Sequence, residues 1–295
     1  MAVMTTIFKR LNIPLSTKKT VGPTTCLEYL GIVLDSGRME ARLPADKVQR
    51  ICDGIRELLG KSVCTKRQLL QLLGHLNFAS RIILPGRPFV SYLINLSTTV
   101  KALHDFVYLT KECRTDLRFW LTFLQQWNGV NMFYNIHLIT SHELDLYTDA
   151  SATISFGGYF RGKWFSSPWP SDIPEVKETS LSIAYKELYP IVVAAILWGS
   201  LWAKQQIVFW CDNEATVAIV NKGRSKYLYI MELMRKLTWC ACIHNFNFRS
   251  KHVPGNCNSI SDSLSRLQIR RFRNLAPQAD LKPHQCPLYS EVIWS

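Results

Sequence analysis

The sequence predicts an α/β protein whose carboxyl-terminal half carries a mixed sheet and whose amino-terminal half is mainly helical. Two observations predict this arrangement. One apolar strand ends at Asp149 and another at Asp212, and a helix-length apolar segment separates them, which is the order of a crossover joining parallel strands. Upstream, apolar residues recur with helical spacing. A content of 47% hydrophobic residues in 295 positions is ample for a packed core.

The first 43 residues are predicted to end in a small β-hairpin. Residues 1–25 are basic and rich in turn-forming residues. An apolar strand then runs from Thr25 to Asp35, a turn follows at Ser36 and Gly37, and a return strand reaches Leu43.

Residues 44–130 are predicted to form a helical module. The apolar stripe from Val48 to Leu59 marks a first helix, which Gly60 ends. Thr65, with Gln68 three positions later, predicts a capping box at the start of a second helix. Two further helices are expected over 89–103 and 113–127. The weakly patterned residues from Asn128 to Ser141 predict a domain boundary.

Residues 142–268 return to strands. Three strands in a meander are expected over 144–150, 154–160 and 163–166, followed by a long helix over 182–202. The remaining elements are a strand ending at Asp212, helices over 214–221 and 226–242, a strand over 246–252, and a helix over 258–267. Pro190 predicts a kink or restart in the long helix. The tail, 269–295, is basic at first and carries prolines, so we expect a loose segment.

The acidic residues that end these strands are the candidate chemistry. Asp149 and Asp212 would lie together, because the carboxyl ends of parallel strands meet at one edge of a sheet. Like charges held this close repel each other unless a cation lies between them. Each aspartate taken alone is equally consistent with an ordinary strand cap. Glu187, early in the long helix, and Asp262, in the last helix, complete a set of four carboxylates.

Four local motifs occur in order with these acids: Tyr147-Thr-Asp-Ala-Ser151, Lys186-Glu-Leu188, Asp212-Asn-Glu-Ala215, and His252 followed by Asn258 and Asp262. Together with the order of elements they resemble the ribonuclease H family, which implies a mixed five-stranded sheet with flanking helices. The resemblance implies a metal-dependent endonuclease that hydrolyses the RNA strand of RNA–DNA hybrids. Asp149, Glu187, Asp212 and Asp262 would then bind two Mg²⁺ ions, with Mn²⁺ as an alternative. His252 would assist proton transfer or product departure.

The upstream residues carry a second resemblance. Leu27-Glu-Tyr-Leu-Gly31, Arg42-Leu-Pro-Ala-Asp-Lys47, Leu73-Gly-His-Leu-Asn-Phe78 and Leu84-Pro-Gly-Arg-Pro-Phe89 resemble the primer-grip hairpin and the thumb or connection region of reverse transcriptases, those of DIRS-type retrotransposons with tyrosine recombinases most of all. Residues 1–43 would be a remnant of the palm end and primer grip, and 44–130 the thumb or connection module. The palm motif Tyr-x-Asp-Asp is absent from the sequence, so polymerisation by this chain alone is not expected. The competing hypothesis is a noncatalytic hybrid-binding or accessory fragment of a larger reverse transcriptase.

The charge balance favours a nucleic-acid partner. Lys and Arg total 35 against 22 Asp and Glu, which gives a formal net charge of +13. Short polar groups beside the acids are candidates for contacts to 2′-hydroxyls, namely Ser151, Asn213 and Asn258. Basic residues that are candidates for contacts to phosphates, or else form an ordinary solvated loop, are Lys222, Arg224 and Lys226. In the helical module, Lys66, Arg67 and Arg81 would grip the duplex. The expected partners are an RNA–DNA hybrid and the remainder of a reverse transcriptase, with no small-molecule cofactor.

Cysteine usage predicts an intracellular protein, without resolving nucleus from cytoplasm. The nine cysteines form an odd set without C-x-x-C spacing, and no secretory leader is evident. Zinc binding by Cys257 with His252, or by Cys286 with His284, is disfavoured because neither pair has a second pair to complete a site. The apolar window 188–203 is shorter than the roughly 20 residues of a membrane span, which predicts a buried helix and no membrane contact.

Overall fold

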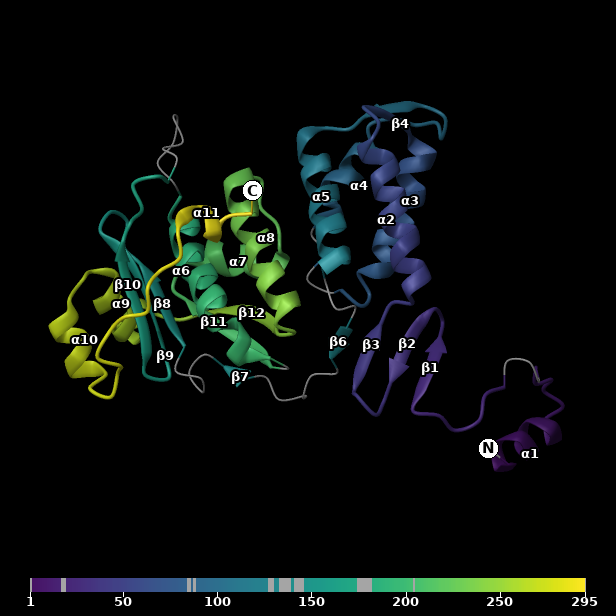
Figure 1. The fold of residues 1–295 in the computed structure, drawn as a ribbon, viewed down its shortest axis with the longest axis horizontal. Helices are drawn as coiled ribbons and strands as arrows, with labels where there is room; N and C mark the ends of the chain where they lie inside the picture. The colour runs from purple at the N-terminus through teal and green to yellow at the C-terminus, as the bar shows by residue number, and fades with distance from the viewer. Residues whose placement is uncertain are drawn as a thin grey trace.

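The structure, a computed structural model, describes residues 2–16, 20–83, 86, 89–126, 130–132, 139–140, 146–173, 182–203 and 205–294, with only the backbone described for 130–132 and 139–140. Figure 1 shows a small sheet and a helical bundle at the amino-terminal end, and an α/β unit at the carboxyl-terminal end. Within these ranges, no helix has both the length and the apolar character needed to cross a membrane.

The amino-terminal sheet differs from the predicted hairpin. It follows helix α1 (Ala2–Arg10) and has the order β1-β2-β3-β6, with strands β1 (Cys26–Tyr29), β2 (Ile32–Asp35), β3 (Glu40–Arg42) and β6 (Val130–Met132). The predicted strand from Thr25 to Asp35 is divided at Leu30 and Gly31, whose φ angles are 49° and 78°. Two successive residues with positive φ reverse the chain in a two-residue turn. The prediction of one continuous strand was therefore wrong.

The helical module contains α2 (Ala45–Leu59), β4 (Val63–Thr65), α3 (Lys66–Ala79), α4 (Ser91–Ser97), β5 (Phe106–Tyr108) and α5 (Lys111–Gln126). The predicted capping box is confirmed: the Gln68 amide donates to Thr65 Oγ1 at 3.3 Å, and the Thr65 amide donates to Gln68 Oε1 at 3.0 Å. Helix α4 is shorter than predicted. It ends where the hydroxyls of Ser97, Thr98 and Thr99 donate to carbonyls three residues earlier, a local bond that competes with the helix.

The α/β unit follows the predicted order of elements. Its members are β8 (Tyr147–Ala150), β9 (Ser155–Phe160), β10 (Lys163–Pro168), α6 (Ile183–Trp198), the 3-10 helix η3 (Gly199–Trp202), β11 (Gln206–Cys211), α7 (Glu214–Lys222), α8 (Leu228–Ile243), β12 (Asn247–His252), the 3-10 helix η4 (Gly255–Cys257) and α9 (Ser259–Ser265). Strands β8, β9 and β10 form the predicted antiparallel meander. Helix α6 is buried on nearly every side and runs through Pro190 without the predicted restart.

The strands of this unit form two three-stranded sheets among the residues described, and not one hydrogen-bonded sheet of five. One sheet has the order β10-β9-β8. In the other, β11 pairs in parallel with β12 and with the short β7 (Ile139–Thr140). Strands β8 and β11 are nevertheless in contact, so their carboxyl ends are close. Strand β7 lies in the segment predicted as a domain boundary, which therefore contributes a strand to the α/β unit.

The carboxyl-terminal tail is ordered, and the prediction of a loose segment was wrong. Helix α10 (Ile269–Leu275) buries Phe272 against the rings of Trp164 and Tyr159, at centroid distances of 5.0 and 6.0 Å. The chain then donates backbone hydrogen bonds from Asp280 to Gly162 and from His284 to Trp164. It continues to helix α11 (Tyr289–Val292), which contacts α6, and in Figure 1 it forms the yellow segment that crosses the α/β unit.

Helix α9 lies unusually close to the meander. A Cβ atom added to Gly157 on β9 would lie 2.5 Å from Cβ of Leu264 on α9. Gly157→Ala is therefore expected to force α9 away from the sheet and to lower the free energy of unfolding by about 1–3 kcal/mol, as overpacked cores do. Urea unfolding would measure this change. Gly74→Ala is the matched control, because nothing lies within 4 Å of the added atom; equal stability of the two variants would refute the close-approach argument.

Candidate active site

The four predicted carboxylates converge on one region of the α/β unit. Asp149 is in β8 and Glu187 in α6, while Asp212 directly follows β11 and Asp262 is in α9. The charges of Asp212 and Asp262 raise the pKa of Asp149, and those of Asp149 and Asp212 raise the pKa of Glu187. This mutual influence requires proximity, so the contact of β8 with β11 and the packing of α6 and α9 bring distant parts of the sequence together.

Burial dominates the electrostatics of Asp149 and Glu187, whose residues are only 8% and 5% exposed. Burial, with the neighbouring charges, raises the pKa of Asp149 to about 6, although a hydrogen bond donated by Ser265 Oγ at 2.5 Å opposes this shift. Burial and the charges of Asp149 and Asp212 raise the pKa of Glu187 to about 9. At neutral pH, therefore, the cluster by itself retains a proton on Glu187. A divalent cation favours the ionised form and would displace that proton.

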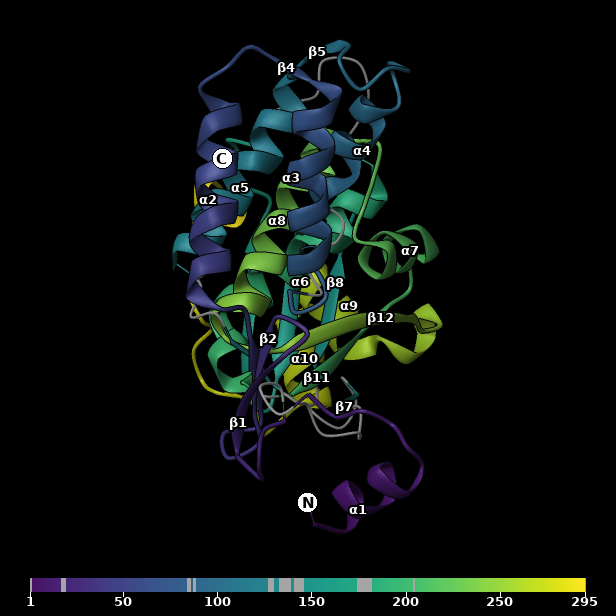
Figure 2. The same cartoon turned by 90° about the vertical axis from the view of Figure 1, so that its right-hand side faces the viewer.

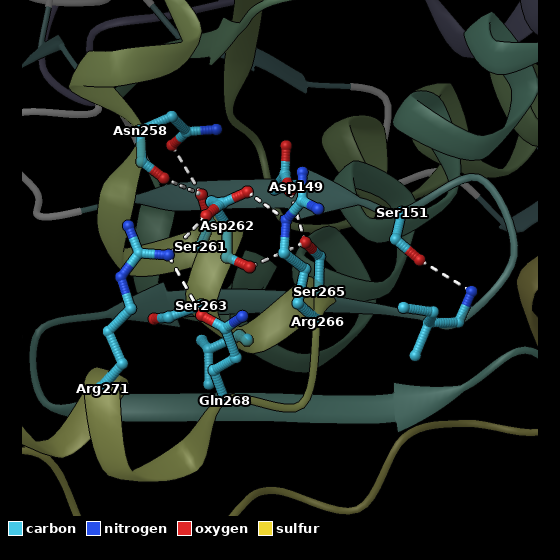
Figure 3. Close-up of polar contacts among 12 residues, drawn as sticks. Asp149, Ser151, Asn258, Ser261, Asp262, Ser263, Ser265, Arg266, Gln268 and Arg271 are labelled. Carbon is cyan, nitrogen blue, oxygen red and sulfur yellow. Dashed lines mark hydrogen bonds and ion pairs between the residues drawn. The ribbon is translucent and has the colours of Figure 1, made fainter.

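Asp262 is held by two arginines, as Figure 3 shows. Arg266 Nε donates to Asp262 Oδ1 at 2.6 Å, and Arg271 Nη1 donates to Oδ2 at 2.8 Å. Burial alone would raise the pKa of Asp262, but the two guanidinium groups outweigh it and lower the pKa. Arg271 comes from α10, in the tail that the sequence predicts as loose. The sequence therefore did not indicate that this carboxylate already has cationic partners.

The donor set of the cluster suits a hard divalent cation. Ligand atoms of Glu187, Cys211 and Asp212 all lie within 4.8 Å of one another. This is the candidate metal-binding group among the described residues, and it includes neither Asp149 nor Asp262. Cys211 was not among the predicted site residues, and strand alternation gave no signal that it would share a site with Asp212. Burial and the charge of Glu187 raise the pKa of the Cys211 thiol, so it stays protonated. Carboxylate oxygens, the remaining donors, are the ligands that Mg²⁺ and Mn²⁺ prefer.

The two zinc pairs that the sequence left open do not gain support. Neither Cys257 with His252 nor Cys286 with His284 belongs to a group that could hold a metal in the part of the chain that the structure describes.

The three short polar residues predicted to contact 2′-hydroxyls have structural partners. Ser151 Oγ accepts hydrogen bonds from the amides of Ile154 and Ser155. Asn213 Oδ1 caps helix α7, accepting from the Thr216 amide at 2.9 Å.

Asn258 departs furthest from its predicted role, because it is only 3% exposed. Its Nδ2 donates to the Thr148 carbonyl at 3.2 Å, and its Oδ1 accepts from Ser261 Oγ at 2.6 Å. In this conformation Asn258 cannot reach a ligand. It instead fixes the start of α9 against β8, and so fixes Asp262 relative to Asp149.

The predicted basic contacts are on the surface. Lys222, Arg224 and Lys226 are exposed on the connection between α7 and α8. His252 is exposed at the end of β12, paired in register with Cys211 and therefore next to Asp212. In the helical module, Lys66 Nζ donates to the Val100 carbonyl at 2.7 Å, so part of its bonding capacity stabilises a turn.

Comparisons with known proteins give slight similarities. No protein-family model matches the chain, and no curated protein matches its sequence. A foamy viral protease-reverse transcriptase dRH in complex with double-stranded DNA is 17% identical with a TM-score of 0.37, covering 85% of this chain and 42% of its own. A foamy viral protease-reverse transcriptase in complex with an RNA/DNA hybrid is 17% identical with a TM-score of 0.36, covering 85% and 33%. The chain thus spans less than half the length of these structures, and the carboxylate cluster, not the similarity, carries the functional proposal.

Proposed function

We propose that the chain is a ribonuclease H, a metal-dependent endonuclease that hydrolyses the RNA strand of RNA–DNA hybrids. The observation that carries the proposal is the convergence of Asp149, Glu187 and Asp212, with Asp262 beside them. Buried carboxyl groups this close do not all ionise at neutral pH by themselves, and a divalent cation would let them ionise together. The upstream motifs support an origin in a retrotransposon reverse transcriptase of the DIRS type, and the net charge supports a nucleic-acid substrate.

The residues have distinct roles in this proposal. Asp149, Glu187 and Asp212 would hold Mg²⁺ or Mn²⁺, and Asp262 would hold a second ion. Bound metal at these residues would supply an activated water and would stabilise charge on the phosphate. Ser265 orients the Asp149 carboxylate through its hydrogen bond. His252, exposed beside Asp212, exchanges a proton at the leaving oxygen or assists product departure. Lys222, Arg224 and Lys226 contact phosphates of the duplex.

A noncatalytic hybrid-binding or accessory fragment is the second candidate, and one observation favours it. Both oxygens of Asp262 are engaged by Arg266 and Arg271. A cation at Asp262 must compete with these two guanidinium groups, whereas a protein that only binds nucleic acid has no such requirement.

Cleavage of a hybrid whose RNA and DNA strands carry different labels tests the proposal. We expect cutting of the RNA strand alone, dependent on Mg²⁺ and abolished by a chelator, with no cutting of double-stranded DNA or of unpaired RNA. Binding of the hybrid without cutting in either Mg²⁺ or Mn²⁺ would support the accessory fragment instead.

A further inference from the structure

A two-stranded sheet at the end of the helical module displays two aromatic rings to solvent. Phe106 and Tyr108 on β5 are 68% and 74% exposed, whereas Val107 between them is 2% exposed. Figures 1 and 2 show β4 and β5 at the end of the bundle remote from β1 and β2. The sheet therefore has one face in the core and one face in solvent.

The outer face is defined by the pairing of the two strands. Val63 pairs with Tyr108 and Thr65 with Phe106, so these four side chains share the outer face, hereafter the β4–β5 face. Among the described residues neither exposed ring has an aromatic neighbour or a cation above it. Exposed neighbouring aromatic rings are unfavourable in water and mark a binding surface more often than isolated apolar residues do.

Basic residues occur in the two segments that form and flank the β4–β5 face. Segments 61–67 and 101–111 contain five basic residues and one acidic residue: Lys61, Lys66, Arg67, Lys101 and Lys111 against Asp105. Backbone hydrogen bonds from Arg67 to Leu103 and from Lys66 to Asp105, each 2.9 Å, bring these cations to the Phe106 end.

Acidic residues near these segments offset part of the positive charge. Glu57 pairs with Lys61 at 2.7 Å, Glu112 directly follows Lys111, and Asp105 keeps its charge while accepting from the Ala102 amide at 2.8 Å. Among the described residues, Arg67 and Lys101 form no side-chain ion pair. These two exposed cations, together with the apolar rings, suit an anionic partner with flat apolar groups.

We propose that the β4–β5 face binds single-stranded nucleic acid, with bases stacked on Phe106 and Tyr108 and phosphates beside Arg67 and Lys101. Side chains two positions apart on a strand are roughly 7 Å apart, which lets each ring stack on a separate base of an extended strand. Base stacking on aromatic side chains tolerates any sequence, and basic residues along the backbone path supply the remaining affinity. The proposal requires neither metal nor cleavage, so it is independent of the proposed nuclease function.

Fluorescence anisotropy with a labelled oligothymidine of about 12 nucleotides, within the site sizes of such surfaces, tests the proposal in the presence of a chelator. The variant Phe106→Leu/Tyr108→Leu keeps the face apolar and removes both rings. We expect its dissociation constant to rise about tenfold or more, and Phe106→Tyr to keep the affinity of the native chain. Leu281→Ala, which removes an apolar side chain 92% exposed in the carboxyl-terminal tail, is the control and should bind normally.

A second variant tests the charges separately. Arg67→Gln/Lys101→Gln should reduce the slope of log affinity against log salt by about 1.4, because each substitution leaves one phosphate without its cation and each such contact contributes about 0.7 on a single strand. Unchanged single-strand affinity in the double leucine variant, or an equal loss in Leu281→Ala, would overturn the proposal. A salt slope unchanged by the glutamine variant, or binding of an acidic peptide that competes with the oligonucleotide, would also overturn it, the latter in favour of a protein partner.

Discussion

Asp149→Asn is expected to reduce cleavage of the RNA strand by about a thousandfold or more. Asp149 contributes charge to a cluster in which it influences Glu187 directly. Its loss removes an anionic ligand from the proposed metal site, and metal-assisted charge stabilisation is worth several kcal/mol. A loss of about 4 kcal/mol of transition-state stabilisation corresponds to a thousandfold in rate. Single-turnover cleavage of the labelled hybrid at saturating Mg²⁺ measures the effect.

The same substitution is expected to stabilise the fold when no divalent cation is present. Burial raises the pKa of Asp149 to about 6, above the value of about 3.9 for an unfolded chain. A folded-state pKa that is raised favours the protonated form, so native stability falls as the pH rises from about 4 to about 6 and stays lower above that. Asparagine does not ionise and avoids this loss, which is at most about 3 kcal/mol.

Unfolding by urea in a chelator should therefore show Asp149→Asn more stable than the native chain at pH 8 and equal to it at pH 4. Adding Mg²⁺ should shrink the difference, because only the native chain gains a bound ion. Asp53→Asn is the matched control, since Asp53 is an exposed aspartate paired with Arg56 on α2 and surface pairs contribute little. If Asp149→Asn retains full cleavage, Asp149 is not a ligand of the metal site. If Asp149→Asn is less stable than the native chain at pH 8, the charge of Asp149 is compensated within the fold.

The sequence predicted the elements of the α/β unit because local signals determine them. Strand alternation and the glycine that ends α7 at Gly223 act over a few residues, as the capping box at Thr65 does in the helical module. The four carboxylates were predicted to converge because strand ends and their order carry that information. The prediction of one five-stranded sheet is not confirmed. Within the described residues the strands form two three-stranded sheets, in one of which β7 pairs with β11.

What the sequence did not predict depends on contacts between distant residues. Arg271 reaches Asp262 only because α10 packs against α9, and the basic, proline-bearing tail gives no local sign of this. Phe272 shows why composition misled the prediction: one buried aromatic residue in a polar segment is enough to order it against Trp164. The turn at Leu30 is similar, because leucine is not a residue that usually marks positive φ.

The junction between the helical module and the α/β unit contains a buried ion pair that the sequence does not reveal. Asp116 on α5 and Arg235 on α8 are 119 positions apart, and Arg235 Nη2 donates to Asp116 Oδ1 at 2.5 Å. Their residues are 0% and 2% exposed. The Arg235 guanidinium also lies over the Phe89 ring, 5.7 Å from its centroid. Trp294, near the end of the tail, contacts Phe119 on α5 and Trp239 on α8, at centroid distances of 5.1 and 5.0 Å. The end of the tail thus contacts both sides of the junction.

Removing Asp116 alone is expected to lower the free energy of unfolding more than removing Arg235 alone. Asp116→Leu leaves a buried guanidinium that cannot lose its proton, and we expect a loss of about 3–5 kcal/mol in the free energy of unfolding. Arg235→Met leaves a carboxylate that can be neutralised, since burial already raises the pKa of Asp116 to about 6 against the opposing effect of Arg235. The loss in the free energy of unfolding of Arg235→Met should therefore be smaller at pH 5 and grow as the pH rises. The fold of this variant favours protonated Asp116, and protonation becomes less favourable at higher pH.

The double variant Asp116→Leu/Arg235→Met distinguishes two cases. Either the ion pair itself stabilises the junction, or each buried charge merely requires its partner. Replacing both charges with apolar groups of similar size removes the cost of burying them, and such replacements are often neutral or stabilising. We expect the free energy of unfolding of the double variant to lie within about 1 kcal/mol of that of the native chain. The double loss would then be smaller than the sum of the two single losses, and this difference is the coupling energy. Urea unfolding of the four proteins gives this cycle directly. Single losses that simply add would show that the two side chains act independently, and two separate transitions in Asp116→Leu alone would show that the pair couples the helical module to the α/β unit.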